Sequence, residues 1–346
     1  FSVLAEAKKL EAQGNPMIHL GLGQPDFKTP KHVVEAAKKA LDDGHHGYTP
    51  ANGTQELRDG VSRHIKKMYG AEINSSRVFI APGGKPSMYF AIMMFGQPGI
   101  EIIYPEPGFP IYESVINYTG AKAVPMYLSE KKNFSFNADE VLSLINDKTR
   151  LLIINNPQNP TGGLIDKNEI DKLVHGLKRF PEVAILSDEI YSRQIYDGKE
   201  MPSFFYYPEL YDRLIVMDGW SKTYAMTGWR LGWSVWPETL IDKVTRMAIN
   251  SYSCVSAANQ VAALAALEGP HDFLDEMMEK FNKRRSLIVN GLNSIPGIKC
   301  NNPGGAFYTF PNVSETGMSG DTFAEKCLFD AGVALVPGTS FGKSCT

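Results

Sequence analysis

The chain has 346 residues, of which 43% are hydrophobic and 21% are charged, an ordinary composition for a globular protein large enough for two lobes. Its formal net charge of -3, with acidic and basic residues interspersed, argues against a nucleic acid partner, which needs a basic face. No run approaches the roughly 18 apolar residues of a membrane span, so we expect no membrane insertion.

The predicted elements begin with helices. Residues 1–14 have an amphipathic helical pattern without the basic start and apolar core of a signal peptide. Further along, apolar residues recur at steps of four, four and three, which predicts a second helix with one apolar face, formed by Leu57, Val61, Ile65 and Met68.

Short β-rich runs then alternate with helical patterns such as 167–180. We expect seven strands, at 78–81, 101–104, 122–126, 150–155, 183–187, 214–218 and 231–235. Continuous apolar runs such as LLII (151–154) are typical of strands covered by helices on both faces. This order predicts an α/β domain with a mostly parallel seven-stranded sheet.

The pattern changes after about residue 270. A long charged helix at 271–292 is followed by Gly/Pro-rich turns and short strands around GGAFYTF (304–310). We therefore predict a large domain over 44–269 and a smaller α+β domain formed by 1–43 and 270–346. Because the chain starts at Phe1 and stops soon after a turn-like VPGTSFG, we expect both termini to be truncated.

The four cysteines are far apart and form no CxxC pair, being Cys254, Cys300, Cys327 and Cys345. Neither disulfides nor a metal site are expected, and a cytoplasmic location is the simplest interpretation.

The strongest chemical signal is GWSKTYAMTGWRLG (219–232). Lys222 follows a predicted strand and has Trp220 and Tyr224 beside it, so it is poorly placed for solvation. A desolvated lysine loses its proton more easily and becomes a nucleophile toward an aldehyde. Arg230, eight positions later, has the planar fork that suits a phosphate. The alternative is an ordinary surface lysine and arginine.

Three more segments follow predicted strands. SDEIY (187–191) places Asp188 at the carboxyl end of a strand, where open α/β sheets bind ligands, although a helix cap or a solvated pair is the commoner role. NNPQNPTGG (155–163) on spacing alone indicates a turn. APGGKPSMYF (81–90) opens a helix at Pro86, and the amides of Gly84 and Lys85 there form either an anion site or a tight turn.

Competing motifs fail. LGLGQPD has Asp26 where a dinucleotide fingerprint requires glycine, and Ser221 precedes Lys222 where a phosphate-binding P-loop requires glycine. The sequence contains no HExxH zinc motif.

Taken in order, the segments closely resemble the class I aminotransferases, the aspartate-aminotransferase-like branch of the fold-type I pyridoxal-phosphate enzymes. The resemblance covers nearly the whole chain, and it rests on LGLGQPDF, GYTPANG, PGGKP, YPEPGFPIY, NNPQNPTG, SDEIY, SKTYAMTGWRLGW, GGAFY and VPGTSFG. It implies the α/β fold of that class and pyridoxal 5'-phosphate as cofactor.

By this resemblance, Lys222 holds the cofactor as a Schiff base, the internal aldimine. Asp188 pairs with the pyridine nitrogen and keeps it protonated, which makes the ring an electron sink. Tyr191 and Asn159 bond the phenolic oxygen of the ring. Lys222, Asp188 and Tyr191 are thus the expected catalytic residues.

The resemblance also assigns the phosphate site. Arg230 clamps the phosphate, with help from the backbone amides of Gly84 and Lys85 and from the Ser221 region. Many relatives have a serine three residues before the lysine, whereas this chain has Gly219, so that contact is lost or replaced.

The resemblance also implies which residues stack on the cofactor ring, contact the substrate and reach the partner subunit. Phe109 stacks on the cofactor ring, and Gly23 and Asn159 contact the substrate. Tyr48 crosses a homodimer interface to the phosphate of the neighbouring subunit. The family binds the substrate carboxylate with an arginine after the VPGTSFG turn. We expect it to lie beyond Thr346; the alternative is a catalytically impaired chain.

We expect an aminotransferase that moves an amino group between an L-amino acid and a 2-oxo acid by a ping-pong mechanism. Aspartate or glutamate with 2-oxoglutarate is the leading substrate pair. One alternative keeps the cofactor but eliminates a β-substituent, as a C–S β-lyase does. The other is a non-catalytic, aminotransferase-like ligand-sensing domain, which would accompany a DNA-binding extension.

Overall fold

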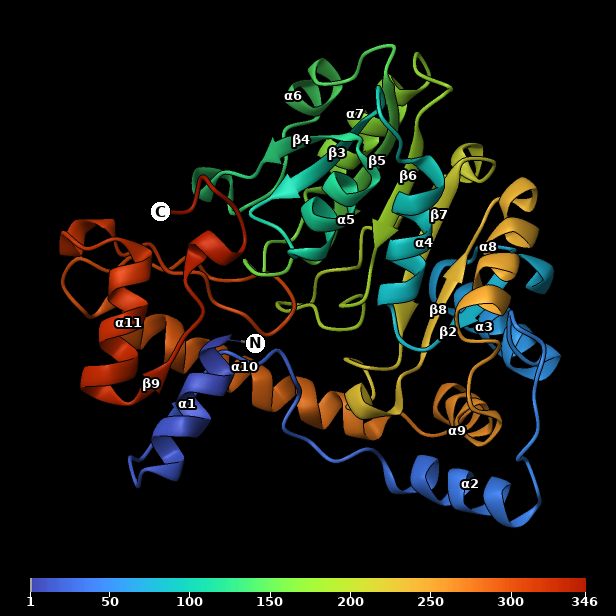
Figure 1. Cartoon of the computed structure of the whole chain (residues 1–346), viewed down its shortest axis with the longest axis horizontal. Coiled ribbons are helices and arrows are strands. Elements are labelled where there is room, and N and C mark those ends of the chain that lie inside the picture. The colour runs from blue at the N-terminus through green and yellow to red at the C-terminus, as the bar shows by residue number, and fades with distance from the viewer. Residues whose placement is uncertain (1) are drawn as a thin grey trace.

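A seven-stranded sheet forms the centre of the computed structural model, which describes residues 2–346 (Figure 1). The strands lie in the order β2-β8-β7-β6-β5-β3-β4, and β8 alone runs antiparallel to its two neighbours. They are β2 (Val78–Ala81), β3 (Glu101–Glu106), β4 (Lys122–Tyr127), β5 (Thr149–Asn155), β6 (Ala184–Asp188), β7 (Leu214–Gly219) and β8 (Gly232–Val235). All seven predicted strands are confirmed, with ends that move by at most two residues.

Helices cover both faces of this sheet (Figure 1). Consecutive residues of β5 alternate between two cores: Leu151 and Ile153 belong to one, and Leu152 and Ile154 to the other. This alternation explains the continuous apolar run, because each face of the strand is buried. One core includes α4 (Lys85–Phe95), α5 (Ile111–Thr119) and α8 (Glu238–Ser251); the other includes α2 (Lys31–Asp42), α3 (Gln55–Tyr69), α6 (Ala138–Ser143), α7 (Lys167–Leu177) and α9 (Ala257–Glu268).

The predicted apolar stripe lies on α3. Leu57, Val61 and Ile65 are fully buried there. Thr54 caps the helix by accepting a hydrogen bond from the Leu57 amide, and Gly70 ends it in the left-handed conformation. The stripe and both caps specify this helix locally.

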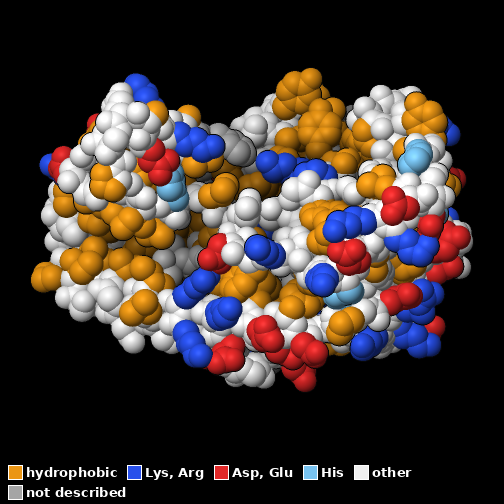
Figure 2. All heavy atoms as spheres, turned by 90° about the horizontal axis from the view of Figure 1, so that it is seen from below, with side chains coloured by type: hydrophobic (Ala, Val, Ile, Leu, Met, Phe, Trp, Pro, Cys, Tyr) orange, Lys and Arg blue, Asp and Glu red, His pale blue; other side chains and the backbone are white. Residues whose placement is uncertain are grey.

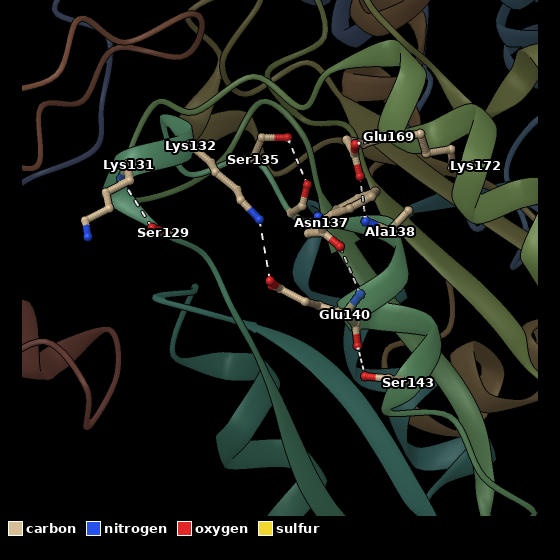
Figure 3. A network of polar contacts seen from close by, with 11 residues as sticks. Ser129, Lys131, Lys132, Ser135, Asn137, Ala138, Glu140, Ser143, Glu169 and Lys172 are labelled. Atoms are coloured by element: carbon tan, nitrogen blue, oxygen red, sulfur yellow. Dashed lines mark hydrogen bonds and ion pairs between the residues drawn. The ribbon is translucent and has the colours of Figure 1, made fainter.

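Side chains also fix the short helix α6 beside α7 (Figure 3). Asn137 caps α6 by accepting from the Glu140 amide at 3.0 Å, and Glu169 of α7 accepts from the Ala138 amide at 2.6 Å. The preceding segment reaches the C-terminal part of the chain, because Asn301 donates to the Glu130 carbonyl at 2.7 Å.

The two ends of the chain meet in a small parallel sheet of β1 (Ile18–His19) and β9 (Val333–Ala334). Near it lie α1 (Ser2–Ala12), α10 (Asp272–Asn293) and α11 (Gly320–Ala331) (Figure 1). α2, by contrast, packs against α9. The division into domains at residues 44 and 269 stays a prediction.

The prediction of short strands around residues 304–310 is wrong. The structure has only an isolated bridge there, between Gly305 and Ile195. The backbone amides of Gly304 and Gly305 instead bond the Gly162 carbonyl, and that of Ala306 bonds the Gln194 carbonyl. Ala306 has a φ of 56°, which interrupts an extended strand.

Candidate active site

A cavity of about 1320 Å³ lies where the loops following β2, β5, β6 and β7 meet the N-terminal segment and residues 307–314. Of the eleven predicted site residues, ten line it: Gly23, Gly84, Lys85, Phe109, Asn159, Asp188, Tyr191, Ser221, Lys222 and Arg230. The exception is Tyr48, whose side chain is 92% exposed. The tertiary fold thus gathers residues that span more than 200 positions of the chain.

Lys222 follows β7 and points into this cavity. Its Nζ donates to the Gly23 carbonyl oxygen and lies 6.0 Å from the ring centre of Tyr191 and 5.7 Å from that of Phe307. Burial, with the charge of Arg230 adding to it, lowers the pKa of Lys222 to about 8. An appreciable fraction of this amine is therefore neutral, and nucleophilic, close to neutral pH.

Asp188 ends β6 and is 2% exposed. Its Oδ2 accepts from the Tyr112 hydroxyl at 2.6 Å, and its Oδ1 accepts from the Ile190 amide at 3.3 Å. Burial raises the pKa of Asp188 to about 6, against the opposing effects of these hydrogen bonds and of Lys222. A buried carboxylate of this kind gains from a cationic N–H donor in the cavity.

Tyr112 was missed in the sequence, although it lies within the YPEPGFPIY segment. Only the fold shows that its hydroxyl reaches the β6 carboxylate. Phe109 packs edge-on against Tyr112, with ring centres 6.1 Å apart, and faces the Lys85 ammonium at 5.4 Å.

Asn159 and Tyr191 meet near the Lys222 amine. The Asn159 Nδ2 donates to the Tyr191 hydroxyl at 3.5 Å, and the Asn159 amide is fixed by Asn155 Oδ1 at 2.8 Å. Burial holds the pKa of Tyr191 well above its ordinary value, so its hydroxyl remains a proton donor. It also lies 2.5 Å from the hydroxyl of Tyr308, another residue missed in the sequence.

The loop between β2 and α4 forms an anion site with Arg230. Gly84 caps α4 and Pro86 lies in its first turn, so the backbone amides at the start of this helix lie at the cavity. The Arg230 guanidinium lies directly over Gly83: a Cβ there would come within 2.1 Å of Arg230 Nη2. Arg230 Nη1 donates to the Thr227 carbonyl at 2.7 Å. Helix amides and a guanidinium are a donor set for a phosphate.

Gly219, where many relatives have serine, is buried in β7 opposite Gly232. A Cβ at this position would lie 3.0 Å from Gly232 Cα and from the Leu231 carbonyl oxygen. The close packing of β7 on β8 therefore leaves little room for a larger side chain.

Within residues 2–346, no cluster of three or more His, Cys, Asp or Glu side chains could hold a metal ion. No helix in that described part is both long and apolar enough to cross a bilayer. On the face shown in Figure 2, basic and acidic side chains are interspersed.

Comparison with known proteins agrees with this fold. Residues 15–345 match the family described as aminotransferase class I and II. An aspartate aminotransferase of Pyrococcus horikoshii is 41% identical over 330 residues, covering 94% of this chain and 83% of the relative. The crystal structure of the Rhizobium meliloti aspartate aminotransferase superposes with a TM-score of 0.93 at 35% identity, covering 99% and 88%. An alanine aminotransferase of Pyrococcus furiosus has a TM-score of 0.92 at 34% identity, covering 99% and 89%.

The chain belongs to the class I and II aminotransferase family. It is an aminotransferase, and the cofactor of this family is pyridoxal phosphate. The donor set fits that cofactor: an amine for its aldehyde, a buried carboxylate for its pyridinium, hydroxyl and amide donors for its phenolic oxygen, and helix amides with Arg230 for its phosphate.

Proposed function

We propose that this aminotransferase works through Lys222, moving an amino group between an L-amino acid and a 2-oxo acid in two half-reactions of a ping-pong cycle. One observation supports the proposal above all: a partly buried amine with its pKa lowered to about 8 faces a cavity that also holds Asp188 and Tyr191. Such an amine can attack a carbonyl and afterwards accept and return a proton near neutral pH.

The residues around this amine would have different roles in the reaction. Bound pyridoxal phosphate supplies an aldehyde for the amino group and a ring that withdraws electrons from the substrate Cα. Asp188 would keep the pyridine nitrogen protonated, and Tyr191 with Asn159 would hold the phenolic oxygen. Lys222 would accept the proton that leaves the substrate Cα and return it.

Further residues would hold the ligand in place. Arg230, Ser221 and the amides of Gly84 and Lys85 would bind the phosphate, and Phe109 would pack on the ring. Gly23 and Asn159 would contact the substrate.

The proposed substrates are aspartate or glutamate with 2-oxoglutarate. The aspartate aminotransferase names of the relatives support this choice. The alanine aminotransferase with the same fold shows that the fold alone leaves the side chain of the substrate open. The substrate preference can be measured directly with a panel of amino acids, followed through the visible absorbance of the bound cofactor.

A homodimer and a cytoplasmic location are also part of the proposal. The exposed Tyr48 ring makes sense if a second copy covers it and if its hydroxyl reaches the phosphate of that copy. The mass of the holoenzyme in solution tests this. All four cysteines are free thiols, as a reducing compartment favours.

Replacement of Lys222 tests the central claim. We expect Lys222→Ala to bind pyridoxal phosphate but to lose at least about a thousandfold in transamination, because the attacking amine and the proton carrier are the same group. Lys243→Ala, at an exposed site on α8, is the control and should keep full activity. Borohydride should trap the cofactor on the peptide that carries Lys222. Undiminished turnover of Lys222→Ala would falsify the proposal.

A further inference from the structure

The hydroxyl groups of Tyr191 and Tyr308 share a hydrogen bond, and its direction decides whether Tyr191 can donate a proton to a ligand. The two oxygens lie 2.5 Å apart, and either can be the donor. A tyrosine hydroxyl has one proton to donate and can also accept hydrogen bonds. If Tyr191 donates its proton to Tyr308, none remains for a ligand in the cavity.

Tyr308 is held firmly in this position. Its segment is fixed on one side by Gly304 and Gly305, whose amides bond the Gly162 carbonyl, and on the other by Ala306, whose amide bonds the Gln194 carbonyl at 2.8 Å. The Tyr308 ring meets that of Tyr191 edge-on, with centres 5.5 Å apart.

The N-terminal segment packs against the Tyr308 hydroxyl through Gly23. A Cβ on Gly23 would come within 2.3 Å of the Tyr308 hydroxyl, so glycine alone allows the two to approach. The carbonyl of the same Gly23 accepts from Lys222. Gly23 therefore contacts both Tyr308 and the reactive amine of Lys222, and Tyr308 also contacts Tyr191 directly.

We propose that Tyr308 is a positioning residue: its hydroxyl donates to the Tyr191 oxygen and so directs the single Tyr191 proton toward the phenolic oxygen of the bound cofactor. This inference rests on the proposed role of Tyr191. A hydroxyl that accepts a hydrogen bond becomes a stronger donor in turn. Tyr308 thus favours the ionised phenolic oxygen through Tyr191, without touching it.

The titratable groups that face this pair are few. Lys222 lies near the Tyr191 ring, and the charge of Asp188 and the hydroxyl of Tyr112 act on Tyr191 from the β6 side. All three side chains remain present in each variant of the pair, so we assign a shift to the missing hydroxyl.

The test is a pH titration of the visible absorbance of the holoenzyme. Tyr308→Phe keeps the ring and removes the hydroxyl, and we expect the midpoint of the visible band to rise by about 0.5 to 1 pH unit. Tyr191→Phe should raise it further. In the double variant, Tyr308→Phe should add nothing to Tyr191→Phe, because its effect passes through that hydroxyl.

Tyr196→Phe is the matched control. Its buried hydroxyl donates to the Ala306 carbonyl at 2.6 Å, so the variant loosens the same segment without touching the pair, and the midpoint should stay. Two results would overturn this inference while leaving the proposed role of Tyr191 intact. One is an unchanged midpoint in Tyr308→Phe. The other is a double variant in which Tyr308→Phe still adds its full shift to that of Tyr191→Phe. If Tyr191→Phe shows no shift, the proposed role of Tyr191 fails and the inference fails with it. Thermal unfolding verifies that each variant is folded.

Discussion

Lys222 owes its chemistry to its neighbours. Burial withdraws water from the ammonium group, the cation of Arg230 repels it, and Asp188 partly offsets both. The result is a lysine with a pKa of about 8, against 10.5 for an ordinary one. The same residue on the surface would be protonated and unreactive at neutral pH.

This balance predicts how the cofactor-free protein reacts with pyridoxal, which lacks a phosphate and so does not need Arg230 for binding. Absorbance should show a rate that rises with pH around a midpoint of about 8, once the background measured with Lys222→Ala is subtracted. Arg230→Met should move the midpoint upward, because the neutral amine loses a favouring cation, and Asp188→Asn should move it downward.

Arg284→Met provides the control, since Arg284 lines the cavity but does not contribute to the pKa shift of Lys222. An equal shift in this variant would mean that overall charge, and not the contact with Arg230, sets the reactivity.

At the scale of elements, the loops at the carboxyl ends of the strands form the site. Parallel strands bring these ends to one edge of the sheet, so the loops after β5, β6 and β7 lie together there. β2 joins the same edge because its partner β8, and not β2 itself, is reversed. The α4 amides therefore face the cavity from the end of β2.

Gly83, in the loop from β2 to α4, is predicted to be essential for the anion site. Its φ is +95°, and a Cβ would collide with Arg230. Gly83→Ala should weaken binding of pyridoxal phosphate by about ten- to a hundredfold, as expected when a charge-assisted contact is displaced, and equilibrium dialysis measures this.

Gly70 offers a control that also has a positive φ. It has a φ of +68° at the end of α3, and a Cβ added to it would have no atom within 4 Å. Gly70→Ala should lose stability but keep the affinity for the cofactor. Equal losses of affinity would show that the effect at Gly83 is general destabilisation.

At the scale of the whole molecule, α10 ties the C-terminal part of the chain to the loops of the sheet. Arg285 of α10 is 8% exposed and donates to Asp197 at 2.6 and 3.0 Å and to the Pro303 carbonyl at 2.9 Å. Its guanidinium also lies 4.3 Å from the ring centre of Tyr196. One buried side chain thus joins three segments that are far apart in sequence.

We expect Arg285→Met to lower the free energy of unfolding by about 2 to 3 kcal/mol, because it removes a buried guanidinium with its bonds to the Pro303 carbonyl and to the half-exposed Asp197. Arg284→Met removes an exposed pair with Asp26 and should cost less than about 1 kcal/mol. Denaturant unfolding measures both.

Arg285 lowers the pKa of Asp197, so the stability that this ion pair contributes is present above pH 3.8 and should decline as the pH falls further. Equal costs for the two arginines would contradict this assignment.

The sequence by itself determined the sheet and much of the cavity lining. Strands such as β5 carry apolar runs typical of a strand covered on both faces, and α3 carries both its stripe and its caps. Lys222 and Asp188 were found because each follows a predicted strand, and the end of a parallel strand is a place that the chain order already defines. Arg230 was found by its place eight positions after Lys222 in the same segment.

Only the tertiary structure decided the contacts between distant segments. It showed that residues 304–310 bond to loops instead of forming strands, and that Tyr112 and Tyr308 reach Asp188 and Tyr191. No local pattern encodes these pairs, because periodicity reports which face of an element is buried and not which side chain it meets. The hydroxyl partners in the site are fixed by packing across the whole chain.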